Sequence, residues 1–287
     1  MAIFKNSLFE TKIHQFYLDD VNKLYVVSDF DGTLTPEYDE SGKRLPSNFA
    51  LIRESGLLKP GYAAQANALF EHYHPFEIDP NLDLAQKKDY MKTWWDSHLN
   101  LIIESGITAD ILMEVSQKQS KCFRPKVDIF FQKLNDLNIP LLIFSAGVGN
   151  IIDIILAENK IEKNSNVHTI SNFFEFANEV PSVNKQIIHT FNKDETVLDG
   201  LPYMDQILDR PNVLVLGNSL GDLGMSAGMN TNTVLSIGFL DKPNMENGEL
   251  EKFQEAYDLV ITESGDFTEV LEILNGFKAQ KKEASNP

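Results

Sequence analysis

The fold of this chain is decided by the stretch Leu24-Tyr25-Val26-Val27-Ser28-Asp29-Phe30-Asp31-Gly32-Thr33. An apolar run typical of a buried strand ends here in two carboxylates that lie one residue apart. Alternation along an extended segment would send Asp29 and Asp31 to the same side, with Phe30 turned into the core, and Gly32 permits a backbone turn. An ordinary Asp-Gly turn at a strand end is the plain alternative. Two aspartates after a fully apolar strand favour a site that holds a divalent cation and attacks a phosphate.

Short apolar runs recur along the chain, and each is followed by turn residues and a helix-like segment. They are Tyr25–Ser28, Leu141–Phe144, Val167–Ser171, Val213–Leu216, Val234–Ile237 and Leu259–Thr262. Strands that alternate with helices predict an α/β fold with a parallel sheet covered on both faces. Ligands of such sheets bind beyond the carboxyl ends of the strands.

Residues 43–123 depart from this alternation of strands and helices, because they contain no convincing buried strand. Helices are predicted there at Pro60–Tyr73, Leu84–Ile103 and Thr108–Lys121, from apolar residues at three- and four-residue spacing. We therefore expect a core made of residues 1–42 and 124–287, with residues 43–123 inserted as a helical cap. Both ends of the insert return to the sheet near Asp31, so the cap would form a lid over the catalytic face.

Composition excludes several classes of partner. The net charge of −17 argues against a nucleic-acid polymer or an anionic membrane surface. No apolar run is long enough to span a membrane, and the N-terminus lacks a signal-peptide pattern. The single cysteine, Cys122, excludes an intrachain disulfide, and no Cys/His cluster suggests zinc. These absences predict a cytoplasmic protein, and the oligomeric state stays open.

Two further strand ends carry polar residues suited to phosphate and metal. Ser145 follows Leu141–Phe144, where its hydroxyl and free backbone N–H groups would cradle phosphate oxygens, although it could equally cap the next helix. Asn218 and Asp222 follow Val213–Leu216 in a glycine-rich loop. Their oxygens suit Mg²⁺, and the alternative for Asp222 is a carboxylate at a helix start.

In combination these motifs resemble the haloacid dehalogenase (HAD) superfamily, and most closely its cytosolic 5′-nucleotidase III (pyrimidine 5′-nucleotidase) family. The resemblance rests on Ser28–Thr35, Gly42–Arg44, Glu77–Pro80, Tyr90–Met91, Ile143–Gly147, Ile188–Lys193 and Leu216–Leu223. It spans roughly residues 20 to 275, nearly the whole chain. It implies a HAD-like doubly wound parallel sheet, with a Rossmann-like core and a helical cap inserted after the first strand.

The resemblance also implies roles for residues at the strand ends. Asp29 would be the nucleophile that forms an aspartyl-phosphate, and Asp31 would be the general acid and then the general base. Ser145, the Ala146 amide and Lys193 would bind the phosphoryl oxygens. Lys193 is assigned by the resemblance alone, because most lysines are solvated surface residues.

The expected cofactor is Mg²⁺, held by Asp29, Asp31, Asn218 and Asp222. At the position of Asn218 the family usually has an aspartate. Asparagine offers a carbonyl oxygen without a negative charge, so weaker Mg²⁺ binding is expected unless Asp222 compensates.

Substrate selection would belong to the cap. Glu77 matches the family glutamate that contacts the nucleoside, and its alternative is a surface carboxylate. Trp94 and Ser97 fall near the other base-contacting region of the family, with a one-residue gap before Ser97. Trp94 and Trp95 could equally pack between helices.

The resulting expectation is an enzyme, a Mg²⁺-dependent 5′-nucleotidase. It would hydrolyse nucleoside 5′-monophosphates, with CMP and UMP preferred. Three alternatives remain. The phosphoryl group could pass to a nucleoside acceptor, the substrate could be another small phosphate such as 7-methylguanosine monophosphate or a sugar phosphate, or the chain could bind nucleotides without turnover.

Overall fold

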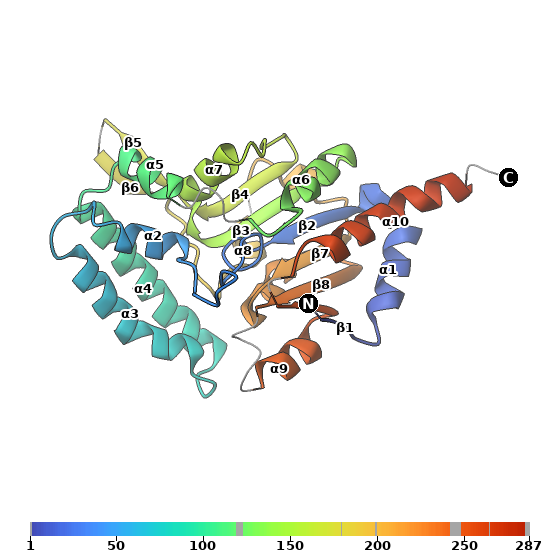
Figure 1. The fold of residues 1–287 in the computed structure, drawn as a ribbon, viewed down its shortest axis with the longest axis horizontal. Coiled ribbons are helices and arrows are strands. Elements are labelled where there is room, and N and C mark those ends of the chain that lie inside the picture. Colours follow the sequence, from blue (N-terminus) through green and yellow to red (C-terminus); the bar gives the residue numbers. More distant parts are fainter. Residues whose placement is uncertain are drawn as a thin grey trace.

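A computed structural model describes residues 2–118, 123–178, 180–198, 200–241, 248–263 and 265–284 of the chain. Its centre is a seven-stranded sheet in the order β1-β9-β8-β7-β2-β3-β4 (Figure 1). Every neighbouring pair is parallel except β1 and β9. The strands are β1 (Ile3–Lys5), β2 (Leu24–Ser28), β3 (Leu141–Val148), β4 (Val167–Asn172), β7 (Asn212–Gly217), β8 (Thr233–Leu240) and β9 (Leu259–Thr262).

All six predicted strands are confirmed, and the predicted α/β class is confirmed with them. Three strands were not predicted. β1 is a three-residue antiparallel strand at the sheet edge, and β5 (Phe174–Ala177) and β6 (Val180–Val183) form a separate hairpin. These strands are short and half exposed, so they lack the buried apolar run that identifies a central strand.

The two faces of the sheet are covered differently. Along β2, Val26 belongs to the larger hydrophobic cluster, which also takes side chains from the helices α1, α6, α7 and α10. Tyr25 and Val27 belong to a smaller cluster on the opposite face, built with residues such as Ile188 and Met225 from loops and short helices. The helices named here and those near them are α1 (Phe9–Leu18), α6 (Val127–Asp136), α7 (Gly149–Glu158), α8 (Glu195–Leu198), α9 (Glu249–Ala256), α10 (Thr268–Ala284) and the 3₁₀ turns η1 (Val21–Lys23), η2 (Met204–Gln206) and η3 (Leu220–Ser226).

Four helices lie between β2 and α6, where the helical insert was predicted. They are α2 (Asn48–Glu54), α3 (Tyr62–Ile78), α4 (Leu84–Glu104) and α5 (Ala109–Gln117). A capping box between Asp83 and Gln86 fixes the start of α4. α3 and α4 run side by side beyond the ends of the central strands, at the left of Figure 1. The boundary at residue 123 stays a prediction, because residues 119–122, with Cys122, lie outside the described part.

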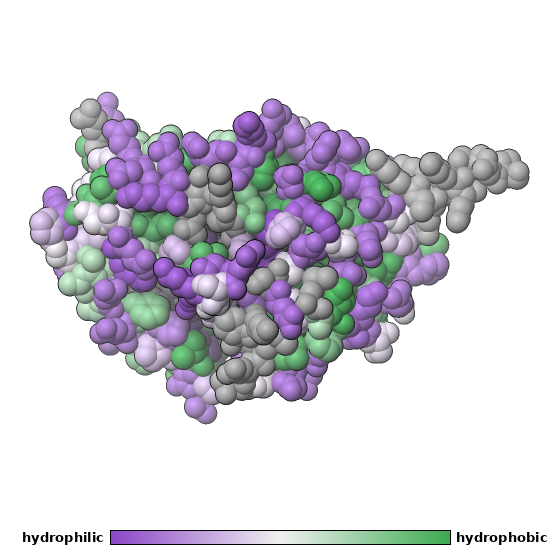
Figure 2. All heavy atoms as spheres, in the orientation of Figure 1, coloured by the Kyte–Doolittle hydropathy of each residue, from purple (hydrophilic) through white to green (hydrophobic). Residues whose placement is uncertain are grey.

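The surface is mostly polar on the face shown in Figure 2, with apolar residues in small patches between hydrophilic ones. This agrees with a chain of net charge −17. Within the described residues, no helix combines the length and apolar character that a membrane span requires.

Candidate active site

The central strand β2 delivers Asp29 to the carboxyl edge of the sheet. Ser28 pairs with Ile143 of β3 and Leu216 of β7, so β2 and β7 end at nearly the same level, while β3 continues to Val148. The Asp29 N–H donates to the Leu216 carbonyl (3.0 Å) and continues this pairing by one residue. The position of Asp29 is therefore set by the sheet.

The chain turns immediately after Asp29. The N–H groups of Thr33 and Leu34 donate to the Phe30 carbonyl, and Gly32 has a φ of +83°. A Cβ at Gly32 would lie 2.1 Å from Asn218 Nδ2, so both the backbone angle and the space require glycine. Phe30 is buried, as the alternation predicted.

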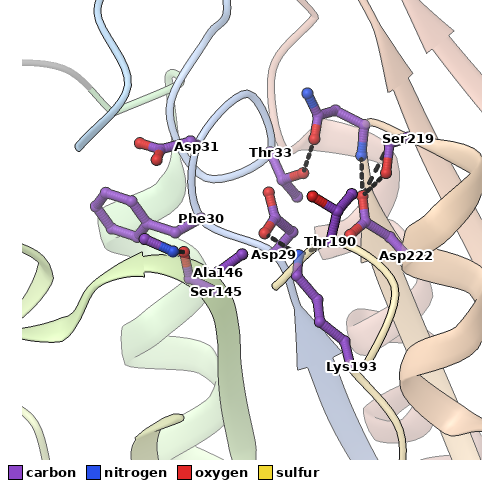
Figure 3. A network of polar contacts seen from close by, with 12 residues as sticks. Asp29, Phe30, Asp31, Thr33, Ser145, Ala146, Thr190, Lys193, Ser219 and Asp222 are labelled. Atoms are coloured by element: carbon purple, nitrogen blue, oxygen red, sulfur yellow. Dashed lines mark hydrogen bonds and ion pairs between the residues drawn. The ribbon is translucent and has the colours of Figure 1, made fainter. Parts of the chain in front are cut away.

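Asp29 and Asp31 have different partners, because the backbone leaves the extended conformation between them. Asp31 Oδ2 accepts from the backbone N–H of Asn48 at the start of α2 (3.2 Å). In Figure 3 the Asp31 carboxylate points away from Lys193, whereas that of Asp29 points toward it. The expectation that simple alternation aligns the two carboxylates is therefore wrong, and the turn at Phe30 is the reason.

Lys193 joins Asp29 to Asp222. Its Nζ lies 2.5 Å from Asp29 Oδ1 and 2.9 Å from Asp222 Oδ1, and all three side chains are buried. Asp222 Oδ2 accepts from the backbone N–H groups of Asn218 (3.1 Å) and Ser219 (3.0 Å) and from the Ser219 hydroxyl (2.9 Å). Figure 3 shows this network at the carboxyl ends of the strands.

Burial and neighbouring charges shift the pKa values of these groups. Burial raises the pKa of Asp29, against the opposing effect of the Lys193 ammonium, and Asp222 raises it further. Burial also raises the pKa of Asp31 to about 6, although the Asn48 N–H opposes the shift. For Lys193 burial would lower the pKa, but the charges of Asp222 and Asp29 outweigh it and raise the pKa. The site thus holds the two buried carboxylates of Asp29 and Asp222 on one ammonium, with the Asp31 carboxyl nearby, and is short of positive charge.

Ser145 and Ala146 lie on an irregular part of β3, where the pairing with β4 shifts between Phe144 and Val148. Ser145 Oγ accepts from the Gly147 N–H (3.1 Å), and the Ala146 carbonyl accepts from Asn172 Nδ2 (2.9 Å). The residue that precedes helix α7 is Val148. Ser145 is therefore not a helix cap, and that alternative is wrong.

Asn218 lies beside the turn that follows Asp29. Its Oδ1 accepts from the Thr33 hydroxyl at 3.5 Å, and its amide group lies against Gly32. Asp222 has a helix-start role as well, because it forms a capping box with Ser219 at η3. The described residues contain no group of three or more His, Cys, Asp or Glu side chains placed to hold a metal ion. The oxygen donors suited to Mg²⁺ are those of Asp29, Asp31 and Asn218.

Helix α3 of the predicted cap contributes Glu77 directly. Glu77 Oε1 accepts from the hydroxyl of Thr190 (2.7 Å), three residues before Lys193, and the Glu77 carbonyl accepts from Lys87 Nζ (2.8 Å). A second contact between cap and core is the ion pair of Lys88 with Asp194 (3.1 Å). The structure thus brings Glu77 to the segment that carries Lys193.

Trp94 and Ser97 lie elsewhere in the cap. Trp94 is buried among the rings of Phe70 and Tyr73 between α3 and α4, which is the packing role considered as its alternative. The Ser97 hydroxyl donates to the Thr93 carbonyl (2.7 Å) of its own helix. Ser97 also lines a cavity of about 550 Å³ between α3 and α4, whose lining includes no strand-end residue.

Trp95 reaches the candidate site instead, and we did not assign it from the sequence. Its Nε1–H donates to the Ala146 carbonyl (2.8 Å), and its ring lies 6.1 Å from that of Phe49. A signal was present, because Met91, Trp94 and His98 continue the buried stripe of α4. Neighbouring residues on a helix point in different directions, so only one of the two tryptophans can occupy that stripe.

Comparison with known proteins agrees with this geometry. The profile of the pyrimidine 5′-nucleotidase (UMPH-1) family matches residues 32–278. The human 7-methylguanosine phosphate-specific 5′-nucleotidase is 33% identical over 258 residues, which are 89% of this chain and 83% of the human one. The 7-methylguanosine phosphate-specific 5′-nucleotidase A from Xenopus laevis is 33% identical over 271 residues, which are 93% of this chain and 90% of that protein.

Solved structures show the same relationship. The crystal structure of cytosolic 5′-nucleotidase IIIB bound to cytidine matches with a TM-score of 0.89 and 29% identity, covering 98% of this chain and 95% of that one. A probable phosphoserine phosphatase from Vibrio cholerae, at 15% identity and a TM-score of 0.52, shares the fold; the match covers 92% of this chain and 68% of that one. The central sheet is therefore HAD-like, and the chain is a 5′-nucleotidase that belongs to the pyrimidine 5′-nucleotidase (UMPH-1) family.

Proposed function

We propose that this enzyme hydrolyses nucleoside 5′-monophosphates, with CMP and UMP preferred, through a phosphorylated Asp29. The supporting observation is the placement of Asp29 beside Lys193, at the end of β2 and between β7 and the strand β3 that carries Ser145. This arrangement supplies a nucleophile, a fixed positive charge and donors for phosphoryl oxygens at one point.

The proposed reaction has two steps. A carboxylate oxygen of Asp29 attacks phosphorus, the bond to the ribose O5′ breaks, and Asp31 donates its proton to that oxygen. A water then attacks the same phosphorus, Asp31 accepts a proton of that water, the bond between phosphorus and the Asp29 oxygen breaks, and phosphate leaves. Lys193 and Ser145 bind the phosphoryl oxygens throughout, while the Asn48 N–H orients Asp31.

The residues present fit a Mg²⁺ ion. Asp29, the Asp31 carbonyl and Asn218 Oδ1 would hold it. The buried carboxylates of Asp29 and Asp222 outnumber the single ammonium between them, which favours an added positive charge. Both Asp222 oxygens already accept hydrogen bonds, so we assign Asp222 to orienting Lys193 and the Asn218 loop. Bound there, Mg²⁺ would neutralise phosphoryl charge and help orient the phosphate.

The cap, proposed as residues 43–123, would select the nucleoside. Glu77 and Trp95 are its residues in contact with the core at the site. The pyrimidine preference is supported by the family name and by the cytidine bound to the similar solved structure. That protein is named cytosolic, which supports the same location for this one.

A second candidate substrate is 7-methylguanosine monophosphate. It is favoured by relatives named for that nucleotide at 32–33% identity. Their names and the family name point to different bases, so the base preference has to be measured.

The test is phosphate release from CMP, UMP, AMP, GMP and 7-methylguanosine monophosphate across a Mg²⁺ titration. Asp29→Asn serves as the chemical blank. We expect Mg²⁺-dependent release, fastest with CMP and UMP and lost in the blank. Fastest release from 7-methylguanosine monophosphate would replace the pyrimidine preference. CMP binding by calorimetry without release would indicate a binding protein, and a phosphorylated product on added uridine would indicate phosphotransfer.

A further inference from the structure

His189 lies in the Ile188–Lys193 segment, and the proposed reaction does not use it. Its backbone is held firmly. Ile188 exchanges two hydrogen bonds of 2.8 Å with the buried side chain of Asn172, and the His189 N–H donates to Asn192 Oδ1 (2.7 Å). The side chain is 4% exposed. The ring is therefore placed by the protein and does not move freely in solvent.

The hydrogen bonds define which ring nitrogen carries the proton. The backbone N–H of Phe191 donates to His189 Nδ1 (3.2 Å), so Nδ1 is the acceptor. Burial, with the charge of Lys88 as a smaller cause, lowers the pKa of His189 to about 4. The ring is neutral at pH 7, and Nε2 carries the proton.

The Nε2–H group has no protein partner in the described part of the chain. Nε2 is not one of the fully enclosed side-chain atoms that lack a partner in the described residues, so it stays accessible although most of His189 is buried. A fixed and accessible donor of this kind can serve an acceptor that arrives from outside the protein.

The surroundings of His189 indicate what brings that acceptor. Its ring centroid lies 6.3 Å from Trp95, whose indole binds the Ala146 carbonyl. The next residue, Thr190, donates to Glu77. Lys193, at the far end of the segment, binds Asp29. His189 thus lies beside Trp95 and next to the residue that binds Glu77, in the segment that also carries Lys193.

We propose that His189 Nε2–H donates a hydrogen bond to an oxygen of the bound nucleoside, either a ribose hydroxyl or a base carbonyl. This inference rests on the proposed nucleotidase function. It makes His189 a specificity-determining residue with a fixed neutral donor. Proton transfer stays with Asp31, because Nδ1 is already occupied by the Phe191 N–H.

Two variants separate the donor from the structural role. In His189→Asn the side-chain oxygen can accept from the Phe191 N–H, but no donor remains at the Nε2 position. In His189→Gln an amide N–H can occupy the Nε2 position. We expect kcat/KM for CMP to fall about 10- to 100-fold in His189→Asn, mainly through KM, and to fall much less in His189→Gln.

Three substrates identify the oxygen. If the ribose 2′-hydroxyl accepts, wild type prefers CMP over 2′-deoxy-CMP, and His189→Asn loses that preference. If the base carbonyl accepts, kcat/KM for CMP and kcat/KM for 2′-deoxy-CMP fall by the same factor in His189→Asn. In that case kcat/KM for 2-thio-CMP falls much less than kcat/KM for CMP. The affinity of His189→Asn for cytidine, measured by calorimetry, should fall in parallel with its kcat/KM for CMP. Hydrolysis of p-nitrophenyl phosphate, which has no nucleoside, reports the phosphoryl site alone.

Two results would overturn the role of His189. One is an unchanged kcat/KM for every nucleotide in His189→Asn. The other is an equal loss with p-nitrophenyl phosphate, which would mean that the substitution disturbs the Lys193 segment. A different result, release from p-nitrophenyl phosphate but from no nucleotide by wild type, would reject the proposed function itself.

Discussion

The core side and the cap side of the candidate site are built in different ways. On the core side, Asp29 and Asn218 directly follow the buried strands β2 and β7, and Ser145 lies in the irregular last part of β3. On the cap side, Glu77 and Trp95 project from helices α3 and α4 and reach the core through single hydrogen bonds. Strand register controls the first group, and helix rotation and packing control the second.

This difference predicts which substitutions in the site also affect folding. Core residues share a charged network in which each side chain restrains the next. Glu77 and Trp95 instead bind separate core partners, Thr190 and Ala146. We therefore expect substitutions in the core to affect chemistry and folding together, and substitutions in the cap to separate binding from stability.

The largest expected effect comes from Lys193→Met, which removes the ammonium between Asp29 and Asp222. Phosphate release should fall at least about 10³-fold, because a preorganised charge at the phosphoryl group is lost. The free energy of unfolding should fall by about 3–5 kcal/mol, since a buried charge loses its partner. Kinetics and urea unfolding measure both. Lys92→Met, an exposed helical lysine paired with Asp96, is the control and should change neither appreciably. Activity within tenfold of wild type would contradict a shared network.

The next effect is the pH dependence of stability, which involves the cap interior. Burial lowers the pKa of His98 from 6.5 to about 4, and the ring is held by Tyr62. At His98 the unfolded chain therefore binds more protons between these values, and the contribution of this residue to stability falls as pH drops from 6.5 toward 4. That contribution should fall by about 2 kcal/mol between pH 7 and pH 5, seen as the difference between wild type and His98→Gln.

Urea unfolding at pH 7, 6 and 5 tests this. His98→Gln should remove this contribution from the dependence of stability on pH. An equal slope in wild type and His98→Gln would show that cap packing does not keep this ring neutral.

Asn218→Asp sharpens the comparison on the core side. It adds a negative charge next to Gly32 and Thr33, where the proposed Mg²⁺ ligands lie. The Mg²⁺ concentration for half-maximal activity should fall about tenfold. Asn22→Asp, an exposed position before β2, adds the same charge away from the site and serves as the control. An unchanged Mg²⁺ curve in Asn218→Asp would remove this residue from the metal site.

The smallest effect separates the two tryptophans. Trp95→Phe removes the hydrogen bond to the Ala146 carbonyl, which retains Asn172 as a partner. KM should rise about fivefold with little change in Tm. Trp94→Phe should lower stability by about 1–2 kcal/mol and leave KM nearly unchanged, because Trp94 fills the space between α3 and α4. The opposite result would mean that Trp94 is the residue at the site.

Much of the core side could be predicted from particular residues. The runs before Asp29, Ser145 and Asn218 are fully apolar, and parallel strands end at one edge, so these residues had to meet. The assignment of Lys193 needed the family resemblance, because its segment has no strand of its own to place it. The contact of Glu77 with that segment also had no signal in local sequence.

The sequence by itself determined the α/β core, the helical insert and the loops that carry the carboxylates. It did so because buried strands and glycine turns have local signatures that tertiary contacts seldom override. Only the tertiary structure decided that Asp31 turns to Asn48, that Trp95 rather than Trp94 reaches Ala146, and that His189 keeps an unpaired donor. A turn or a rotation of one residue along a helix, about 100°, redirects a side chain completely, and packing between distant segments sets that direction.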